Sequence, residues 1–140
     1  MFRLLMNSIY YIHAIYYFTK CSKSLTIRIA FSTIIKVRLI ANAYKKLKKS
    51  LVELGIEVEL KKEILDFSIF IKDPLQSNRI WIAERPLEEW IGATVGKSQC
   101  CDVCGDSECR TISINQDTFE NIPENLIIKA GLLAAVELFK

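Results

Sequence analysis

The front of this 140-residue chain lacks acidic residues, and its first carboxylate side chain is Glu53. The chain also has only five glycines, three prolines and one histidine. The few glycines and prolines exclude a collagen-like or low-complexity chain. The single His13 excludes a histidine-rich metal site and an evident Ser-His-Asp triad. The sequence holds no glycine-rich phosphate loop, no G-x-S-x-G and no H-E-x-x-H motif.

The chain also lacks an uninterrupted apolar run long enough for a membrane span. The run Leu4–Phe18 has 15 residues, and a spanning helix needs about 20. The run Leu25–Ala43 is interrupted by three basic residues. No small-residue cleavage site follows either run in a favourable position, which argues against a signal peptide. We therefore expect no membrane span and a cytoplasmic location.

Charge divides the chain into two unlike parts. Residues 1–52 carry ten basic and no acidic residues, whereas residues 53–140 carry nine basic and all 16 acidic residues. The overall net charge of +3 gives no reason to expect nucleic acid as a partner. We predict that residues 1–40 are a divergent segment, either a first strand and the start of a first helix or sequence that is not native. Residues 41–140 are predicted to form the main domain.

The apolar pattern predicts an alternation of strands and helices. Strands are expected at 8–17, 56–60, 79–83, 87–91 and 111–114, and helices at 36–54, 63–72 and 123–139. Gly55 is expected to end the first of these helices, and Pro123 to occupy the first turn of the last one. The acidic pair Glu88 and Glu89 is expected on a solvated surface.

Four of the five cysteines lie within ten residues, at Cys100, Cys101, Cys104 and Cys109. The C-x-x-C-G sequence at 101–105 resembles a turn in which backbone amides face two sulfurs, and thiolates suit zinc or an iron–sulfur cluster. These four cysteines are therefore one candidate set of metal ligands, with zinc as the candidate ion. Adjacent cysteines seldom bind one metal together, however, and no second knuckle of a zinc ribbon is present.

The same cysteines have two other interpretations. Cys101 and Cys104 could cycle between dithiol and disulfide, while Cys100 or Cys109 resolves a mixed disulfide. Basic neighbours favour a reactive thiolate and acidic neighbours oppose it. The basic neighbours are Lys97 and Arg110, and the acidic ones are Asp102, Asp106 and Glu108. In the third interpretation the cysteines only form structural disulfides or remain free. The residues by themselves leave all three interpretations open.

Five runs of sequence carry a family resemblance. They are LGIEVEL at 54–60, DPLQSNRIWI at 73–82, RPLEEWIG at 85–92, CCDVCGDSECRT at 100–111 and IPENLIIKAGL at 122–132. Together they resemble the uncharacterised thioredoxin-like family catalogued as domain of unknown function 2703, over about residues 41–140. The cysteine run is the most specific motif. The resemblance implies an α/β thioredoxin-like fold: a mixed central sheet flanked by helices, with a cysteine-rich loop at 98–110 inserted before the last strand and C-terminal helix.

Cys21 gains a candidate role from this resemblance. It is predicted to follow the first strand and to precede a helical region, where a thioredoxin-like fold carries its nucleophile near a helix N-terminus. Cys21 and Ser24 would form a monothiol counterpart of a C-x-x-C motif, with Phe18 in the place of a first cysteine. An isolated cysteine is more often inert, so this role is a hypothesis.

The sequence thus predicts a thiol-based redox or thiol-relay protein. Its candidate catalytic residues are Cys101, Cys104 and Cys21, and its candidate activity is that of a thiol–disulfide oxidoreductase acting on a protein thiol or disulfide partner. The alternative is a non-catalytic module that binds zinc or another thiophilic metal through the four clustered cysteines. A third hypothesis is an adaptor domain whose cysteine-rich loop is held by structural disulfides. No cofactor other than zinc is suggested.

Overall fold

The larger of two β-sheets has four strands in the order β2-β1-β3-β4. The computed structural model describes residues 23–31, 37–64, 68, 72, 73, 75, 79–99 and 108–140. The strands are β1 (Lys23–Phe31), β2 (Ile56–Ile64), β3 (Arg79–Ile82) and β4 (Arg85–Pro86). β1 pairs in parallel with β2 and antiparallel with β3, and β3 pairs antiparallel with β4. β1 is therefore an interior strand of a mixed sheet.

Strand β1 forms where apolar and polar residues alternate. Leu25, Ile27 and Ile29 are fully buried, and the intervening Thr26 and Arg28 are only partly buried. This period of two places the three apolar side chains on one face of the sheet. The core therefore lies on that face.

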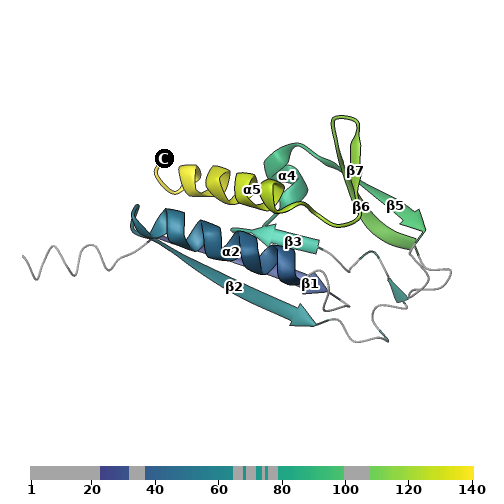
Figure 1. The fold of residues 1–140 in the computed structure, drawn as a ribbon, viewed down its shortest axis with the longest axis horizontal. Helices are drawn as coiled ribbons and strands as arrows, with labels where there is room; N and C mark the ends of the chain where they lie inside the picture. The colour runs from purple at the N-terminus through teal and green to yellow at the C-terminus, as the bar shows by residue number, and fades with distance from the viewer. Residues whose placement is uncertain are drawn as a thin grey trace, which may run out of the picture.

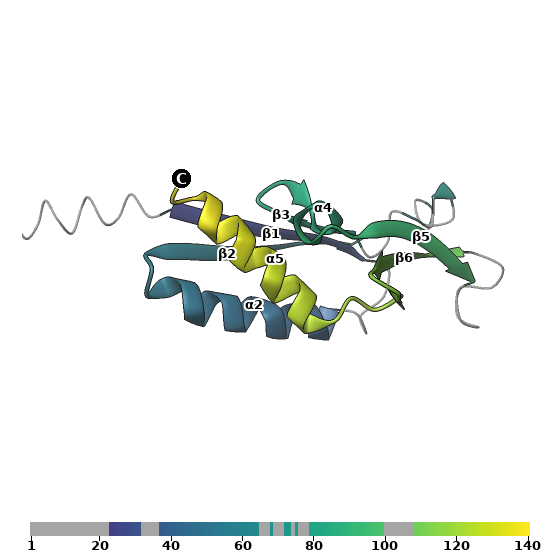
Figure 2. The same ribbon diagram turned by 90° about the horizontal axis from the view of Figure 1, so that it is seen from above.

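Two helices cover the apolar face of this sheet. They are α2 (Val37–Val52), which connects β1 to β2, and α5 (Glu124–Glu137) near the end of the chain. Ile127 of α5 and Leu47 of α2 join the same buried cluster as the β1 side chains. Figures 1 and 2 show α2 and α5 side by side. They pack closely at Gly131, where an added Cβ would lie 2.5 Å from Cδ1 of Leu47.

A second, smaller sheet follows in the chain. It consists of β5 (Thr94–Gln99), β6 (Glu108–Ile114) and β7 (Asp117–Phe119), all antiparallel, in the order β5-β6-β7. The short helix α4 (Leu87–Ile91) connects the two sheets. Leu87 and Ile112 are both buried in the common core, so the second sheet packs against the first layer through α4.

A two-residue turn joins β3 and β4. Ile82 pairs with Arg85, and the residues between them, Ala83 and Glu84, have φ of +50° and +61°. Two central residues with positive φ are typical of a type I′ turn, which fits the twist of a β-hairpin. Non-glycine residues rarely adopt this conformation. The turn places the Glu84 side chain close to Arg28 of β1.

Several predicted elements are confirmed and others are corrected. The helix expected at 36–54, its end at Gly55, the strand at 79–83 and the C-terminal helix after Pro123 are all present. The strand predicted at 56–60 continues to Ile64, so Glu63 is in a strand and not in the predicted helix at 63–72. The strand predicted at 8–17 lies outside the described residues.

The prediction of a strand at 87–91 is wrong, because these residues form helix α4. Leu87 and Ile91, four residues apart, are both buried and face the core, as one side of a helix requires. Glu88 in the first turn interacts favourably with the helix dipole. Gly92 ends the helix with a left-handed φ of +67°, the usual conformation after a helix. The short apolar run contained too few residues to distinguish the two periods.

The observed architecture is a mixed α/β fold with two sheets and three helices among the described residues. Both β1 and the start of α2 lie within the segment 1–40 that the sequence set apart. Within the described part of the chain, no helix combines the length and apolar character that crossing a membrane requires.

Candidate thiol site at the β5–β6 hairpin

The clustered cysteines belong to one hairpin. Gln99 at the end of β5 pairs with Glu108 at the start of β6, so residues 100–107 connect the two strands. Cys109 lies on β6, opposite Ser98 of β5. The other three clustered cysteines, Cys100, Cys101 and Cys104, lie outside the described residues, as does Cys21.

Cys109 is buried and disulfide-bonded. Its side chain is 7% exposed, and it takes part in a disulfide. Its partner is one of the four remaining cysteines of the chain, none of which is among the described residues. The sulfur of Cys109 is therefore bonded to the sulfur of a second cysteine in this structure.

The neighbouring residue on β6 makes a nearly buried ion pair. The guanidinium Nη2 of Arg110 donates to Oε1 of Glu88 on α4, and the two side chains are 6% and 13% exposed. The expectation that Glu88 lies on a solvated surface is therefore wrong, whereas Glu89 is exposed. The helical turn of α4 is the reason, because it directs Glu88 toward β6. The pair links the cysteine-bearing hairpin to the rest of the fold.

Both cations expected to favour a reactive thiolate have carboxylate partners. Lys97 Nζ lies 3.6 Å from Glu108 Oε2, and both of these side chains are more than half exposed. Arg110 pairs with Glu88. A paired cation exerts a weaker net field on a nearby thiolate than a free one, because the carboxylate opposes it. These cations therefore favour a thiolate less than the sequence suggested.

The element that follows Cys21 in the chain differs from the sequence prediction. The element that follows it is strand β1, which begins at Lys23, and not a helical region. The reason is the alternation of apolar and polar residues from Leu25 onwards, which gives a strand. Cys21 thus precedes the amino end of β1 and does not lie directly before a helix N-terminus. The apolar run Leu25–Ala43 spans both this strand and the start of α2, which hid the strand in the sequence pattern.

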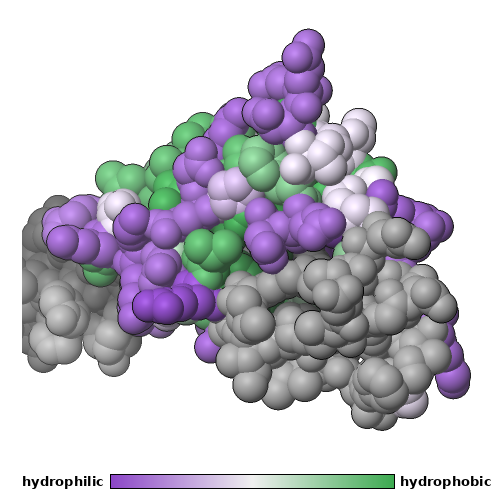
Figure 3. Space-filling view, turned by 45° about the vertical axis from the view of Figure 1, so that its right-hand side comes forward, coloured by the Kyte–Doolittle hydropathy of each residue, from purple (hydrophilic) through white to green (hydrophobic). Residues whose placement is uncertain are grey.

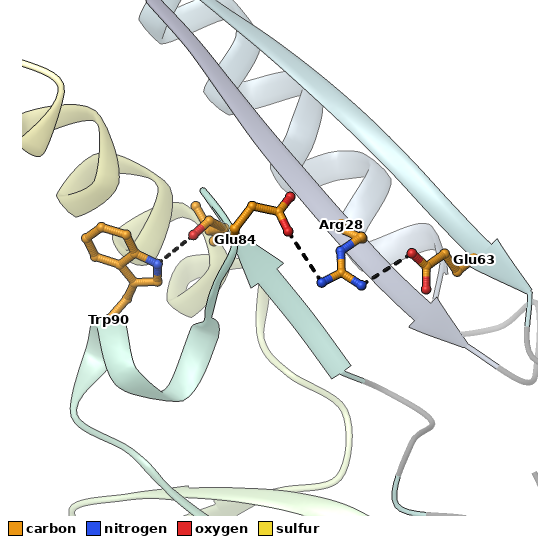
Figure 4. A network of polar contacts seen from close by, with 5 residues as sticks. Arg28, Glu63, Glu84 and Trp90 are labelled. Atoms are coloured by element: carbon orange, nitrogen blue, oxygen red, sulfur yellow. Dashed lines mark hydrogen bonds and ion pairs between the residues drawn. The ribbon is translucent and has the colours of Figure 1, made fainter.

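A polar network that no sequence motif indicated occupies the opposite face of the larger sheet. Arg28 Nη1 lies 3.3 Å from Glu63 Oε1 of β2, and Nη2 lies 3.5 Å from Glu84 Oε2 (Figure 4). The guanidinium also stacks 3.9 Å from the ring centroid of Trp81. Trp90 Nε1 donates a 2.8 Å hydrogen bond to the carbonyl of Ile82. These contacts order the β3–β4 turn, and they assemble no nucleophile with a base.

The structure offers no metal centre of its own among the residues it describes. No group of three or more histidine, cysteine or carboxylate side chains there is arranged to hold an ion. Of the four candidate ligands, only Cys109 lies in the described part of the chain. A zinc site at this hairpin would require Cys109 to be reduced, because zinc binds the thiolate.

Comparison with known proteins gives one family and one relative. A family model described as "Domain of unknown function (DUF2703)" matches residues 22–131. The match thus starts before β1, earlier than the expected resemblance from residue 41. An "Uncharacterized protein" of Archaeoglobus fulgidus is 44% identical over 85 residues, which cover 61% of this chain and 62% of the relative. No solved structure matches.

Proposed function

We propose that this chain, which belongs to the family of domain of unknown function 2703 (DUF2703), is a thioredoxin-like protein with a thiol redox or thiol-relay function. Cys101 and Cys104 form the exchanging pair, and Cys100 and Cys109 are auxiliary cysteines. One observation carries the proposal: Cys109, on the strand that follows the C-x-x-C motif, is disulfide-bonded. A cysteine of this segment is thus close enough to another cysteine for disulfide formation.

The strand order supports the thioredoxin-like part of the proposal. A parallel β1–α2–β2 unit, an antiparallel β3–β4 hairpin and a C-terminal helix on the side of the first helix are the arrangement of that fold. Here the order is β2-β1-β3-β4, and α5 packs beside α2. The small β5-β6-β7 sheet lies between β4 and α5 in the chain, as expected for a cysteine-bearing insertion. Fold likeness alone is a weak argument for activity, so the cysteines carry the functional part.

The proposed reaction is thiol–disulfide exchange with a protein partner. A thiolate of the Cys101–Cys104 pair attacks one sulfur of the partner's disulfide, and the partner's other sulfur leaves as a thiolate. The second cysteine of the pair then attacks the mixed disulfide. The partner gains two electrons and becomes a dithiol, and the pair becomes a disulfide. A second dithiol protein restores the pair by the reverse exchange.

Cys109 has an auxiliary role in this scheme. As a disulfide-bonded cysteine near the pair, it can pass oxidation between its own bond and the Cys101–Cys104 pair by intramolecular exchange. Its burial limits direct attack by an external thiol. Direct contact with the partner is therefore assigned to the pair, and not to Cys109.

Cys21 is proposed to react separately from the hairpin. The amino end of β1 and the Gln99–Glu108 end of the β5–β6 hairpin lie at opposite ends of the molecule in both Figure 1 and Figure 2. Cys21 is two residues from Lys23, a span of at most about 7 Å. It is therefore a poor candidate for the partner of Cys109.

Zinc binding by Cys100, Cys101, Cys104 and Cys109 is the second candidate function. The disulfide at Cys109 argues against it, because one sulfur cannot be both in a disulfide and a thiolate ligand. The two functions also differ in what they require. Ligation free energy contributes directly to folding, whereas an exchange pair can be lost without loss of the fold.

The test combines disulfide mapping, metal content and turnover. Protein purified without oxygen or chelator would be assayed for zinc and iron, and for reduction of insulin disulfides by a dithiol. We expect no stoichiometric metal, and loss of turnover in Cys101→Ser and Cys104→Ser with an unfolding transition in excess dithiol that matches that of the unaltered protein. Cys21→Ser is the matched control and should retain turnover. About one metal per chain, lost together with stability in each of the four serine variants, would overturn the redox proposal in favour of the metal module.

A further inference from the structure

Helix α5 is apolar on its outer face as well as its inner face. Its inner face is formed by Ile127, Ala130, Gly131, Ala134 and Ala135, which are all buried. On the outer side Leu132, Val136 and Phe139 are 44%, 58% and 54% exposed. A surface helix normally carries polar residues opposite its buried face, and a helix that is apolar all round is usually covered all round.

These three outer residues form a continuous strip, here called the α5 stripe. Leu132 and Val136 are four residues apart on the helix, and Phe139 follows in the turn after it, where its backbone N–H donates to the carbonyl of Val136. Figure 3 shows hydrophobic atoms gathered at the upper left of the coloured surface, in the region of α5. Glu137 lies within the same turn, but it pairs with Arg85 of β4 at 3.3 Å. A contiguous apolar strip of this kind marks a surface that is covered by something.

The amino end of β1 lies beside the end of this stripe. Lys23 Nζ is 3.8 Å from the ring centroid of Phe139. Lys23 is also the first residue of β1. Residues 1–22 therefore join the fold directly next to the exposed apolar strip.

We propose that the apolar run Leu4–Phe18 of the same chain packs on the α5 stripe. Its composition fits, because 12 of its 15 residues are apolar or aromatic and none is aspartate, glutamate, lysine or arginine. Its length also fits. The four residues 19–22 can extend over about 13 Å, and the stripe from Leu132 to Phe139 is about 10 Å long. The run can therefore reach the whole stripe from its attachment at Lys23.

Packing in cis has a thermodynamic advantage over packing between molecules. A segment tethered a few residues from its binding surface has a high effective concentration there. Covering the stripe within one chain therefore requires no second copy, and it is independent of protein concentration. This property distinguishes the proposal from dimerisation through the same stripe.

Hydroxyl-radical footprinting of the full chain tests the proposal, because it reports side-chain accessibility in solution. Val95 of β5 is the internal reference, since it is 49% exposed and lies on the other sheet. We expect Val136 and Phe139 to be oxidised several-fold more slowly than their exposed fractions predict relative to Val95, equally at low and high protein concentration. The double variant Ile9→Asp, Ile12→Asp should remove this protection and leave Val95 unchanged. Asn7→Asp, which adds one charge without removing an apolar side chain, is the control variant.

A second measurement changes the α5 stripe and follows the oxidation of the apolar run, so that the test does not depend on one variant. Val136→Asp should speed the oxidation of Met6, which lies within the run, and leave Met1 unchanged. Three results would overturn the proposal. The stripe could be oxidised as fast as Val95 in the unaltered chain, or remain protected in the double variant. Protection that increases with protein concentration would instead assign the stripe to a second copy.

Discussion

Glu88 on α4 accepts a hydrogen bond from the guanidinium of Arg110 on β6, and both side chains are nearly buried. The two residues are 22 positions apart and belong to different layers of the fold. Arg110 follows the disulfide-bonded Cys109 directly. The ion pair thus holds β6 against α4. β6 carries Cys109, and α4 links the two sheets.

Removing one partner of this ion pair should lower the unfolding free energy more than removing both partners. Glu88→Ala leaves a buried guanidinium without its counter-charge, and we expect a loss of about 3 kcal/mol of unfolding free energy. The double variant Glu88→Leu, Arg110→Met should lose less than Glu88→Ala, because no charge remains buried. Urea unfolding measures both. Glu89→Ala, at the exposed neighbouring position, is the control, and an equal loss there would contradict the role of the pair.

The disulfide of Cys109 should contribute to stability only under oxidising conditions. We expect Cys109→Ser to lower the unfolding free energy by about 2–4 kcal/mol, because a cross-link restricts the unfolded chain. In excess dithiol the variant and the unaltered protein should differ far less. Thermal or urea unfolding with and without reductant gives the comparison. Ser98→Ala, opposite Cys109 on β5, should show no such dependence on reductant. A redox-independent loss in Cys109→Ser would assign the effect to packing alone.

The close contact of α5 with α2 at Gly131 should be sensitive to a single methyl group. Gly131→Ala places a Cβ within 2.5 Å of Leu47 Cδ1, and Leu47 is fully buried. Overpacking should outweigh the better helix propensity of alanine, for a net loss of about 1–2 kcal/mol. In a Leu47→Ala background the same substitution should become neutral or stabilising. A double-mutant cycle by urea unfolding measures the coupling, and simple additivity would show that the two side chains do not compete for space.

The β3–β4 turn should be improved by a residue that tolerates positive φ. Ala83 has a φ of +50° and is exposed, so a substitution changes little packing. A non-glycine residue in the left-handed region costs about 1 kcal/mol, and asparagine less. Ala83→Asn should therefore raise the unfolding free energy by about 0.5–1 kcal/mol. The β-branched variant Ala83→Val should lower it. A gain from both substitutions would exclude backbone conformation as the cause.

The longer elements could be predicted from the sequence because each repeats its period several times. Residues 56–60 alternate strictly, and the helix that Gly55 follows shows apolar residues every three or four positions. Strand β1 was missed because its apolar residues continue into those of α2 without an intervening charge cluster. Helix α4 was missed because five residues contain little more than one turn, and the burial of Leu87 and Ile91 depends on the packing of both sheets.

The candidate site was visible in the sequence only as a cluster of cysteines. Spacing alone indicated a C-x-x-C motif, and it could not show that Cys109 is disulfide-bonded and buried. The pairing of Arg110 with Glu88 depends on the crossing of α4 and β6, which no local pattern encodes. The same holds for Arg28, whose partners Glu63 and Glu84 come from another strand and from a turn.

The interior position of β1 has a consequence for the order in which the chain folds during synthesis. β2 follows β1 after one helix, so this half of the sheet can form early. The other edge of β1 stays unpaired until β3 has been made, because Ile27 pairs with Ile82. An unpaired edge with apolar residues is a site for association between nascent chains. The stretch around Ile27 and Ile29 is therefore most prone to association with other nascent chains before β3 leaves the ribosome.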